Sequence, residues 1–359
     1  MKVVLAIDSF KGTFSSRYIE DALSARLKAL GVEVVSLPVA DGGEGLVDVL
    51  HPVLGGDLIT LSVTGPDGDK VVAQYLLKGD LAIVETAQAA GIALSKLHSA
   101  ADTTTYGVGE MIRDAMSRGA KEVLLGLGGS ATCDGGCGMA AALGWFFFNR
   151  HGDKFLPIGR TLKDIDRIVR DNDYPITALS DVTNPLYGPK GAAYVFAPQK
   201  GAGPEEVEML DQGLQHLAYV LRSEDIAIID RPMAGAAGGL GGMVHVLGGK
   251  LTRGIDRVLD LVGYDEAVRD ADFVITGEGR LDSQSLDGKV MDGVVSRKGR
   301  ARALALVGSC LLDDPARYGI EKVFETNPDH LPFEAIKGSL AADMDRAIQG
   351  IVEYIKGEL

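Results

Sequence analysis

Short apolar runs alternate with amphipathic segments along most of this 359-residue chain. Unbroken aliphatic runs at residues 3–7 and 123–125 are typical of parallel strands that are buried on both faces, and the mostly apolar residues 301–307 predict another strand. Apolar residues recur at helical spacing in residues 16–30 and 204–222, which predicts helices there. Strands that alternate with helices in this way predict an α/β fold built on parallel sheet.

The middle of the chain begins with a different pattern. Three short runs between residues 58 and 84 are separated by turn sequences and predict antiparallel hairpins. We therefore expect a discontinuous domain, residues 1–64 and 270–359, with a second α/β domain, residues 65–269, inserted into it. Residues 146–173 are basic and predict an irregular surface excursion, and residues 333–356 predict one closing amphipathic helix.

Polar residues follow several of the predicted strands. Asp8 and Asp41 follow the first two strands, and Asp181 follows a short strand at residues 176–179. The carboxyl ends of parallel strands form the edge of a sheet where ligands bind, so these side chains are candidates for a binding site. Asp8 and Asp41 are also explained by a second interpretation, in which they only cap helices.

The glycine-rich stretch at residues 126–136 lies between a predicted strand and a predicted helix. Such a loop lets backbone N–H groups approach an anion, and the helix N-terminus adds positive potential, so phosphate is the leading ligand. A tight turn needed only for packing explains the pattern equally well. Asp134 favours a turn or helix-cap role. A second glycine run, residues 235–242, suits either phosphate approach or close helix packing.

Composition narrows the class of protein. The net charge of −14 disfavours a nucleic-acid partner but allows a small anionic ligand or Mg²⁺. The three cysteines do not form a metal-binding pattern; Cys133 and Cys137 are interpreted as small residues in a crowded loop. The first residues lack a signal-peptide layout and no run is long enough to span a membrane, so we expect a cytoplasmic protein.

Taken together, these loops resemble the glycerate kinase family of the bacterial type that forms 2-phosphoglycerate. The resemblance implies an ATP-dependent kinase that uses magnesium to phosphorylate D-glycerate, with a Rossmann-like or flavodoxin-like domain and a second α/β domain around a cleft. Cys133, Cys137 and the segment 290–293 depart from the expected pattern, which affects local packing more than the reaction. The matching segments are 8–12, 39–45, 85–88, 104–107, 126–132, 181–185, 198–202, 235–241 and 277–282.

The resemblance and the needs of phosphoryl transfer together assign roles to residues. The predicted catalytic residues are Asp181, Asp41, Lys11 and Arg280, and the first two are also the predicted magnesium ligands. The predicted substrate-binding residues are Asp8, Ser9, Lys11, Arg280 and Glu278. The predicted ATP-binding residues are Gly128, Gly129, Ser130, Gly238, Gly239 and Lys200.

Some of these assignments have simpler alternatives. Arg280 is also explained by a structural ion pair with Glu278 or Asp282, and Lys200 by a solvated cation on a loop. A regulatory protein that binds a nucleotide or sugar acid without turnover is the alternative function. An NAD-linked oxidoreductase is a third, although the first βα turn lacks the dinucleotide glycine pattern. The sequence leaves open the hydroxyl that is phosphorylated, with the 2-position expected over the 3-position, and it allows a homodimer.

Overall fold

The computed structural model describes residues 1–10, 12–40, 42–43, 45–227, 229–282 and 289–359. The chain divides into two compact units. Unit 1 consists of residues 1–41, 52–54 and 255–359, and unit 2 of residues 42–51 and 55–254. Both units combine helices with largely parallel sheet, so the predicted α/β fold class is confirmed.

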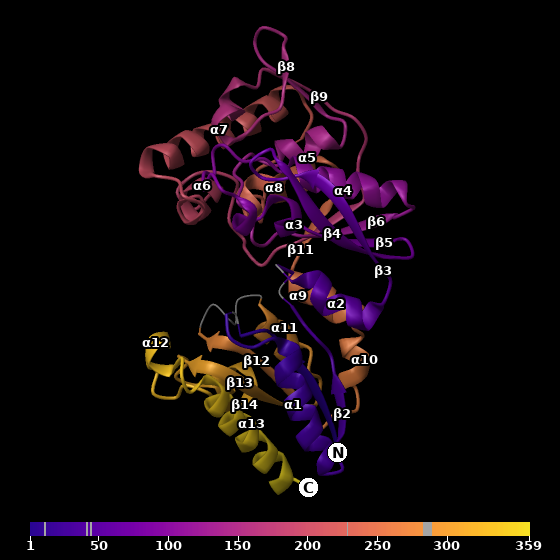
Figure 1. Cartoon of the computed structure of the whole chain (residues 1–359), viewed down its shortest axis with the longest axis vertical. Coiled ribbons are helices and arrows are strands. Elements are labelled where there is room, and N and C mark those ends of the chain that lie inside the picture. The colour runs from indigo at the N-terminus through magenta and orange to yellow at the C-terminus, as the bar shows by residue number, and fades with distance from the viewer. Residues whose placement is uncertain (11, 41, 44, 228, 283–288) are drawn as a thin grey trace. The chain divides into compact units, whose positions relative to one another are not determined.

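Unit 1 contains a parallel five-stranded sheet in the order β14-β13-β12-β1-β2 (Figure 1). Its central strands are aliphatic and buried on both faces, as expected for parallel sheet. β1 pairs with β12 from Val3 and Phe273 onward, so the two ends of the chain share this sheet. The strands are β1 (Lys2–Ile7), β2 (Glu33–Ser36), β12 (Phe273–Leu281), β13 (Arg302–Cys310) and β14 (Ile320–Glu325).

Two long helices pack against one face of this sheet. α1 contributes Ile19, Leu23 and Leu27 at helical spacing, and α13 contributes residues such as Ile348 and Ile351 to the same core cluster. The oxygen of Ser15 accepts the N–H of Tyr18 and caps α1, as the sequence indicated. The helices of this unit are α1 (Ser16–Ala29), α9 (Gly254–Leu261), α10 (Tyr264–Val268), α11 (Val290–Ser296), α12 (Phe333–Ile336) and α13 (Leu340–Gly357).

Unit 2 is built on a mixed six-stranded sheet in the order β11-β10-β6-β5-β4-β3. β5, β6, β10 and β11 run parallel, whereas β3 and β4 form the antiparallel hairpins that the turns predicted. The strands are β3 (Asp57–Thr64), β4 (Lys70–Lys78), β5 (Leu81–Glu85), β6 (Glu122–Gly126), β10 (Ile176–Leu179) and β11 (Lys250–Thr252). Its helices are α2 (Leu46–Leu54), whose residues 52–54 are counted with unit 1, α3 (Ala87–Ala90), α4 (Tyr106–Ser117), α5 (Cys137–Ala142), α6 (Ala192–Phe196), α7 (Pro204–Ser223) and α8 (Leu240–Val246).

The structure corrects two expectations. Residues 146–173 are not an irregular excursion, because they contain the antiparallel sheet β8-β7-β9: β7 (Phe146–Phe148), β8 (Lys154–Phe155) and β9 (Arg167–Val169). Burial of Phe147 anchors this sheet, whose strands are too short for a periodic pattern to be visible. The predicted closing helix is two helices, α12 and α13, separated by residues 337–339. Gly338 lies in this break, and glycine has a low helix propensity.

Candidate active site

Four parallel strands of unit 2 end at a common edge. The register aligns Glu85 of β5 with Gly126 of β6, Gly126 with Leu179 of β10, and Leu179 with Thr252 of β11. The loops that follow these ends carry the glycine turn at residues 128–130 and Asp181. The topology therefore places several predicted ATP- and magnesium-binding residues on one sheet edge, where α/β proteins bind ligands.

The turn of Gly128, Gly129 and Ser130 has backbone donors that the described part of the fold leaves unpaired. Gly129 has a φ of 72°, a left-handed conformation that glycine adopts without strain. The carbonyl of Gly129 accepts the N–H of Ile92 at 2.9 Å, which fixes the turn against the neighbouring segment. Within the described residues, the N–H groups of Gly128, Gly129 and Ser130 have no hydrogen-bond partner. These three groups can therefore donate to an anion.

The helix N-terminus after this loop does not supply the anion site that the sequence suggested. The carboxylate of Asp134 accepts the N–H groups of Gly136 at 3.0 Å and Gly138 at 3.2 Å. The N–H of Met139 donates to the Oγ1 of Thr105 at 2.9 Å, so the first turn of α5 is already satisfied. A bound anion there would have to displace the cap, so the N-terminus of α5 offers no open donor to an anion.

Asp134 has the cap role predicted for it. It is fully buried and also accepts the N–H and the Oγ1–H of Thr105, each at 2.8 Å, which ties this loop to the start of α4. Burial raises the pKa of Asp134, while the donated hydrogen bonds oppose that rise. Cys133 and Cys137 are buried small residues beside it, as predicted, and their thiols have raised pKa values because of burial.

Lys200 lies beneath the same turn. It ends the short helix η3 (Pro198–Lys200) and is only 6% exposed, which excludes the solvated-cation interpretation. Its Nζ donates to Ser130 Oγ at 2.9 Å and to the carbonyl of Thr132 at 2.7 Å. Burial lowers the pKa of Lys200 to about 8, partly opposed by Cys133 and Asp134. The structure thus brings two predicted ATP-binding residues, Ser130 and Lys200, into direct contact.

The second glycine run packs against the first. A Cβ on Gly238 would lie 2.0 Å from the carbonyl oxygen of Thr132, and one on Gly239 would lie 2.8 Å from the Cα of Gly135. The N–H of Gly135 also donates to the carbonyl of Gly238 at 3.0 Å. Close packing therefore explains why residues 238 and 239 are glycines, and their role in ATP binding stays a prediction.

Two carboxylates at the sheet edge have different surroundings. Glu85 is buried and accepts the N–H groups of Gly45 at 2.9 Å and Val47 at 2.7 Å, so it caps the start of α2. Asp181 is half-buried, and its Oδ1 accepts the N–H of Gly254 at 3.1 Å. Asp181 is therefore the more accessible carboxylate. Asp41, the other predicted magnesium ligand, lies outside the described residues.

The predicted substrate residues belong to unit 1, at the carboxyl ends of β1 and β12. Asp8 follows β1 and accepts the N–H of Ser9 at 2.7 Å through Oδ1, while its own N–H donates to Gly277. The Arg280 side chain is 67% exposed, and its Nε lies 3.7 Å from Oδ2 of Asp282. The ion pair with Asp282 that the sequence allowed is therefore present, but it is long and exposed to solvent. Glu278 is half-buried on the same strand. Lys11 lies outside the described residues.

Sequence reasoning missed a buried acid beside this edge. Glu20 of α1 is 4% exposed, and its Oε1 accepts the N–H of Ile7 at the end of β1 at 3.2 Å. Burial raises the pKa of Glu20 to about 8. No local signal marks Glu20, because it occupies a core-facing position of an otherwise ordinary amphipathic helix.

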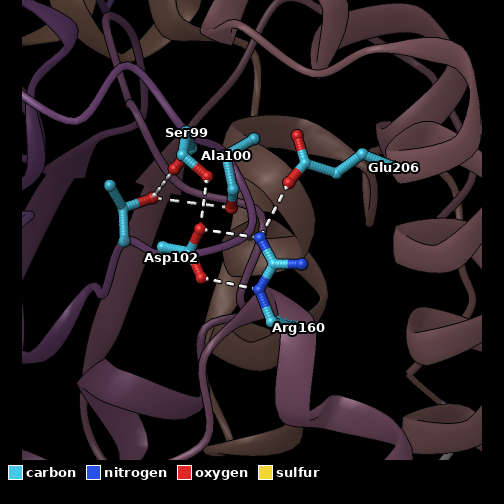
Figure 2. Close-up of polar contacts among 6 residues, drawn as sticks. Ser99, Ala100, Asp102, Arg160 and Glu206 are labelled. Atoms are coloured by element: carbon cyan, nitrogen blue, oxygen red, sulfur yellow. Dashed lines mark hydrogen bonds and ion pairs between the residues drawn. The ribbon is translucent and has the colours of Figure 1, made fainter.

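An exposed charge network lies outside the glycine loop (Figure 2). Arg160 donates to both oxygens of Asp102, at 2.8 and 2.7 Å, and to Glu206 at 3.1 Å. Figure 2 shows Ala100 beside this network, and the carbonyl of Ala100 accepts the N–H of Cys133 at 3.2 Å. The Arg160 guanidinium lowers the pKa of Asp102. Residues 100–102 therefore contact both Arg160 and the loop that contains Cys133.

Within the described part of the chain, no group of three or more His, Cys, Asp or Glu side chains is arranged to hold a metal ion. Among the described helices, none combines the length and apolar character that crossing a bilayer requires.

Comparison with known proteins gives consistent matches over the whole chain. The model of the glycerate kinase family matches residues 3–356. The chain is 38% identical to the glycerate kinase of Bacillus subtilis (strain 168), over 99% of this chain and 98% of that protein. It is 39% identical to the glycerate 2-kinase of Escherichia coli (strain K12), over 90% of each. A crystal structure named as glycerate kinase 2 from Salmonella typhimurium LT2 matches with a TM-score of 0.84 and 34% identity, covering 100% of this chain and 99% of that one.

Proposed function

Because the chain belongs to the glycerate kinase family, we propose that it transfers the γ-phosphoryl group of ATP to the 2-hydroxyl of D-glycerate. The products are 2-phosphoglycerate and ADP. A bond forms between the glycerate oxygen and the γ-phosphorus, the bond from that phosphorus to the β–γ bridging oxygen breaks, and the hydroxyl proton passes to a carboxylate. The family comparisons support this catalytic interpretation over a regulatory protein without turnover.

The main support for this function is the set of backbone N–H groups at residues 128–130 that have no partner among the described residues. Phosphoryl transfer leaves little covalent work to the protein, which must align the reactants and stabilise charge on the phosphoryl oxygens. Backbone N–H groups held at a strand end suit that task, since they are fixed by the fold and need no reorientation during the reaction. The open N–H groups of Gly128, Gly129 and Ser130 support an ATP-phosphate site at this turn.

Asp181 fits the role of magnesium ligand or general base. Its carboxylate supplies hard oxygen ligands, and proteins usually hold Mg²⁺ through one or two carboxylates together with substrate phosphates. A single accessible carboxylate at the sheet edge meets that requirement, so the lack of a larger ligand cluster among the described residues is no obstacle. When bound, the ion would neutralise charge on the phosphates. Asp41 shares this proposed role.

The residues of unit 1 are proposed to bind glycerate. The guanidinium of Arg280 is exposed and can pair with both oxygens of a carboxylate. Asp8, Ser9 and Glu278 lie at the carboxyl ends of β1 and β12, and they offer acceptors and donors for the hydroxyl groups. Lys11 completes the proposed set. We further propose that the enzyme works in the cytoplasm and that a homodimer is compatible with this activity.

A coupled assay tests the proposal. Purified protein, ATP, Mg²⁺ and D-glycerate should release ADP, and adding enolase alone should consume the product, because enolase acts on 2-phosphoglycerate and not on the 3-isomer. ATP binding without ADP release would favour the regulatory alternative. Asp181→Asn should lower kcat at least about hundredfold with an unchanged melting temperature. Near-normal turnover by that variant would remove Asp181 from the catalytic set.

A further inference from the structure

The contact between Lys200 and Ser130 restricts what the Ser130 hydroxyl can do. A protonated lysine has three N–H donors and no acceptor, so at 2.9 Å the Ser130 oxygen must accept from Nζ. The hydroxyl proton of Ser130 then cannot point at Lys200. It must point to another side of the oxygen, and the backbone N–H of Ser130 itself is one of the open donors of the 128–130 turn.

Lys200 itself is poorly placed to reach a ligand. Lys200 is 6% exposed and Ser130 is 4% exposed, so burial does not separate the two residues. What separates them is that two of the three N–H donors of Nζ are already taken, by Ser130 Oγ at 2.9 Å and by the carbonyl of Thr132 at 2.7 Å. Burying a charged lysine is costly, so its position beneath the turn calls for a compensating role. Both hydrogen bonds of Lys200 go to the loop that carries the open donors, so Lys200 acts by fixing groups of that loop.

We propose that Lys200 is a positioning residue that forces the Ser130 hydroxyl to act as a hydrogen-bond donor to the ATP phosphates, without touching the nucleotide itself. This inference rests on the proposed function of the 128–130 turn. It adds a fourth donor, the Ser130 O–H, to the backbone N–H groups, and it assigns Lys200 an indirect role in place of the direct ATP contact predicted from the sequence.

The mechanism makes ATP affinity sensitive to alkaline pH. Burial brings the pKa of Lys200 to about 8, and when its proton leaves to bulk solvent the neutral amine can accept the Ser130 O–H. The hydroxyl is then no longer forced toward the ligand. Within the described residues, the titratable side chains that act on Lys200 are Cys133 and Asp134. The pKa of Cys133 is raised to about 12, so its thiol stays neutral through this range.

The primary test measures the Kd of Mg·ATP for the full-length protein by calorimetry between pH 7 and 9.5. The phosphates of ATP stay ionised there, since the second pKa of a phosphate ester lies near 6. Wild type should lose affinity through a step near pH 8. Ser130→Ala should bind about tenfold or more weakly at pH 7 and should lack the step. A step of unchanged size in Ser130→Ala would overturn the proposal without requiring any Lys200 variant to fold.

A double-mutant cycle provides the second test. Lys200→Met should weaken ATP binding in the wild-type background and have little further effect in Ser130→Ala, because both changes remove the same donor. Additive losses would show that Lys200 contacts ATP directly and would overturn the inference. Lys163→Met, at an exposed lysine, should leave the Kd unchanged. ADP release from ATP in the presence of D-glycerate is measured separately, so a failed kinase assay with intact ATP binding contradicts the proposed function alone.

Discussion

The two glycine-rich segments of unit 2 look alike in the sequence and differ in the structure. Gly128 and Gly129 form an exposed or half-buried turn whose N–H groups have no partner among the described residues. Gly238 and Gly239 are buried and lie against the backbone of residues 132–135, where a Cβ would not fit. In the first segment the absence of a side chain opens the backbone to a ligand. In the second segment it lets two loops pack together.

The comparison shows that a glycine run alone does not identify a phosphate site. What separates the segments is the hydrogen-bond state of the backbone and the space around each Cα. Even within the first segment, the N–H groups from Gly135 onward are used by Gly238, by Asp134 and by Thr105. Four variants test this difference between the two segments.

The largest effect is expected at Gly238. Gly238→Ala places a Cβ 2.0 Å from the Thr132 carbonyl at a φ of 69°, so overpacking and backbone strain add up to a loss of about 3–5 kcal/mol in the free energy of unfolding. Urea denaturation measures this change in the free energy of unfolding. Gly203→Ala is the matched control, because nothing lies within 4 Å of its Cβ, and it should change stability by less than about 1 kcal/mol. Equal effects would contradict the packing role.

The next effect is expected at Asp134, which holds the buried end of the first segment. Asp134→Asn replaces one acceptor oxygen by an amide donor that faces backbone N–H groups, and a buried donor left without an acceptor costs about 1–3 kcal/mol. We expect urea denaturation to show a loss of about 2–3 kcal/mol in the free energy of unfolding. The KM for ATP should change much less, because Asp134 does not contact the open donors of the 128–130 turn. A variant of wild-type stability with no ATP affinity would instead place Asp134 in the binding site.

At Gly129 we expect a small effect on stability and a large effect on the KM for ATP. Gly129→Ala introduces a side chain at a φ of 72° in an exposed turn, which costs only about 1–2 kcal/mol in stability. The added methyl group crowds the open N–H donors, so we expect the KM for ATP to rise at least about tenfold. Steady-state kinetics and urea denaturation on the same preparation measure both quantities. An unchanged KM would mean that ATP phosphates do not bind this turn.

The smallest effect is expected outside both segments, at Arg160. Arg160→Met removes the ion pairs with Asp102 and Glu206, but these side chains are partly exposed, and such pairs contribute about 0–1 kcal/mol. The KM for ATP should not change. A large loss of affinity would show that the exposed network, rather than the buried hydrogen bonds of residues 131–139, positions the glycine turn.

Much of the fold could be predicted because its signals are local. β1 and β6 contain continuous apolar runs, β10 is a short and mostly apolar strand, and α1 and α7 show helical periodicity, so these elements are confirmed. The sheet at residues 146–169 was missed because strands of two or three residues carry no periodicity. The break at Gly338 was missed because the apolar pattern continues on both sides of it.

The site could be predicted only in part, because its decisive contacts are not local. The cap role of Asp134 was visible from its place before a helix, and the structure confirms it. The contact of Lys200 with Ser130 and the capping of α2 by Glu85 depend on which loops the sheet order brings together, and no single stretch of sequence contains that order. The same limit applies to the fit between Gly238 and Thr132.

The pairing of β1 with β12 has a consequence for how the protein is made. During synthesis β1 and β2 leave the ribosome first, yet the strand that must lie beside β1 begins at Phe273. The apolar side chains of β1 therefore lack this sheet neighbour until residues 273–281 of the 359-residue chain have been made, whereas the strands of the unit 2 sheet are complete once Thr252 has emerged. Chaperone capture of truncated nascent chains should accordingly concentrate on the N-terminal strands and end when β12 becomes available.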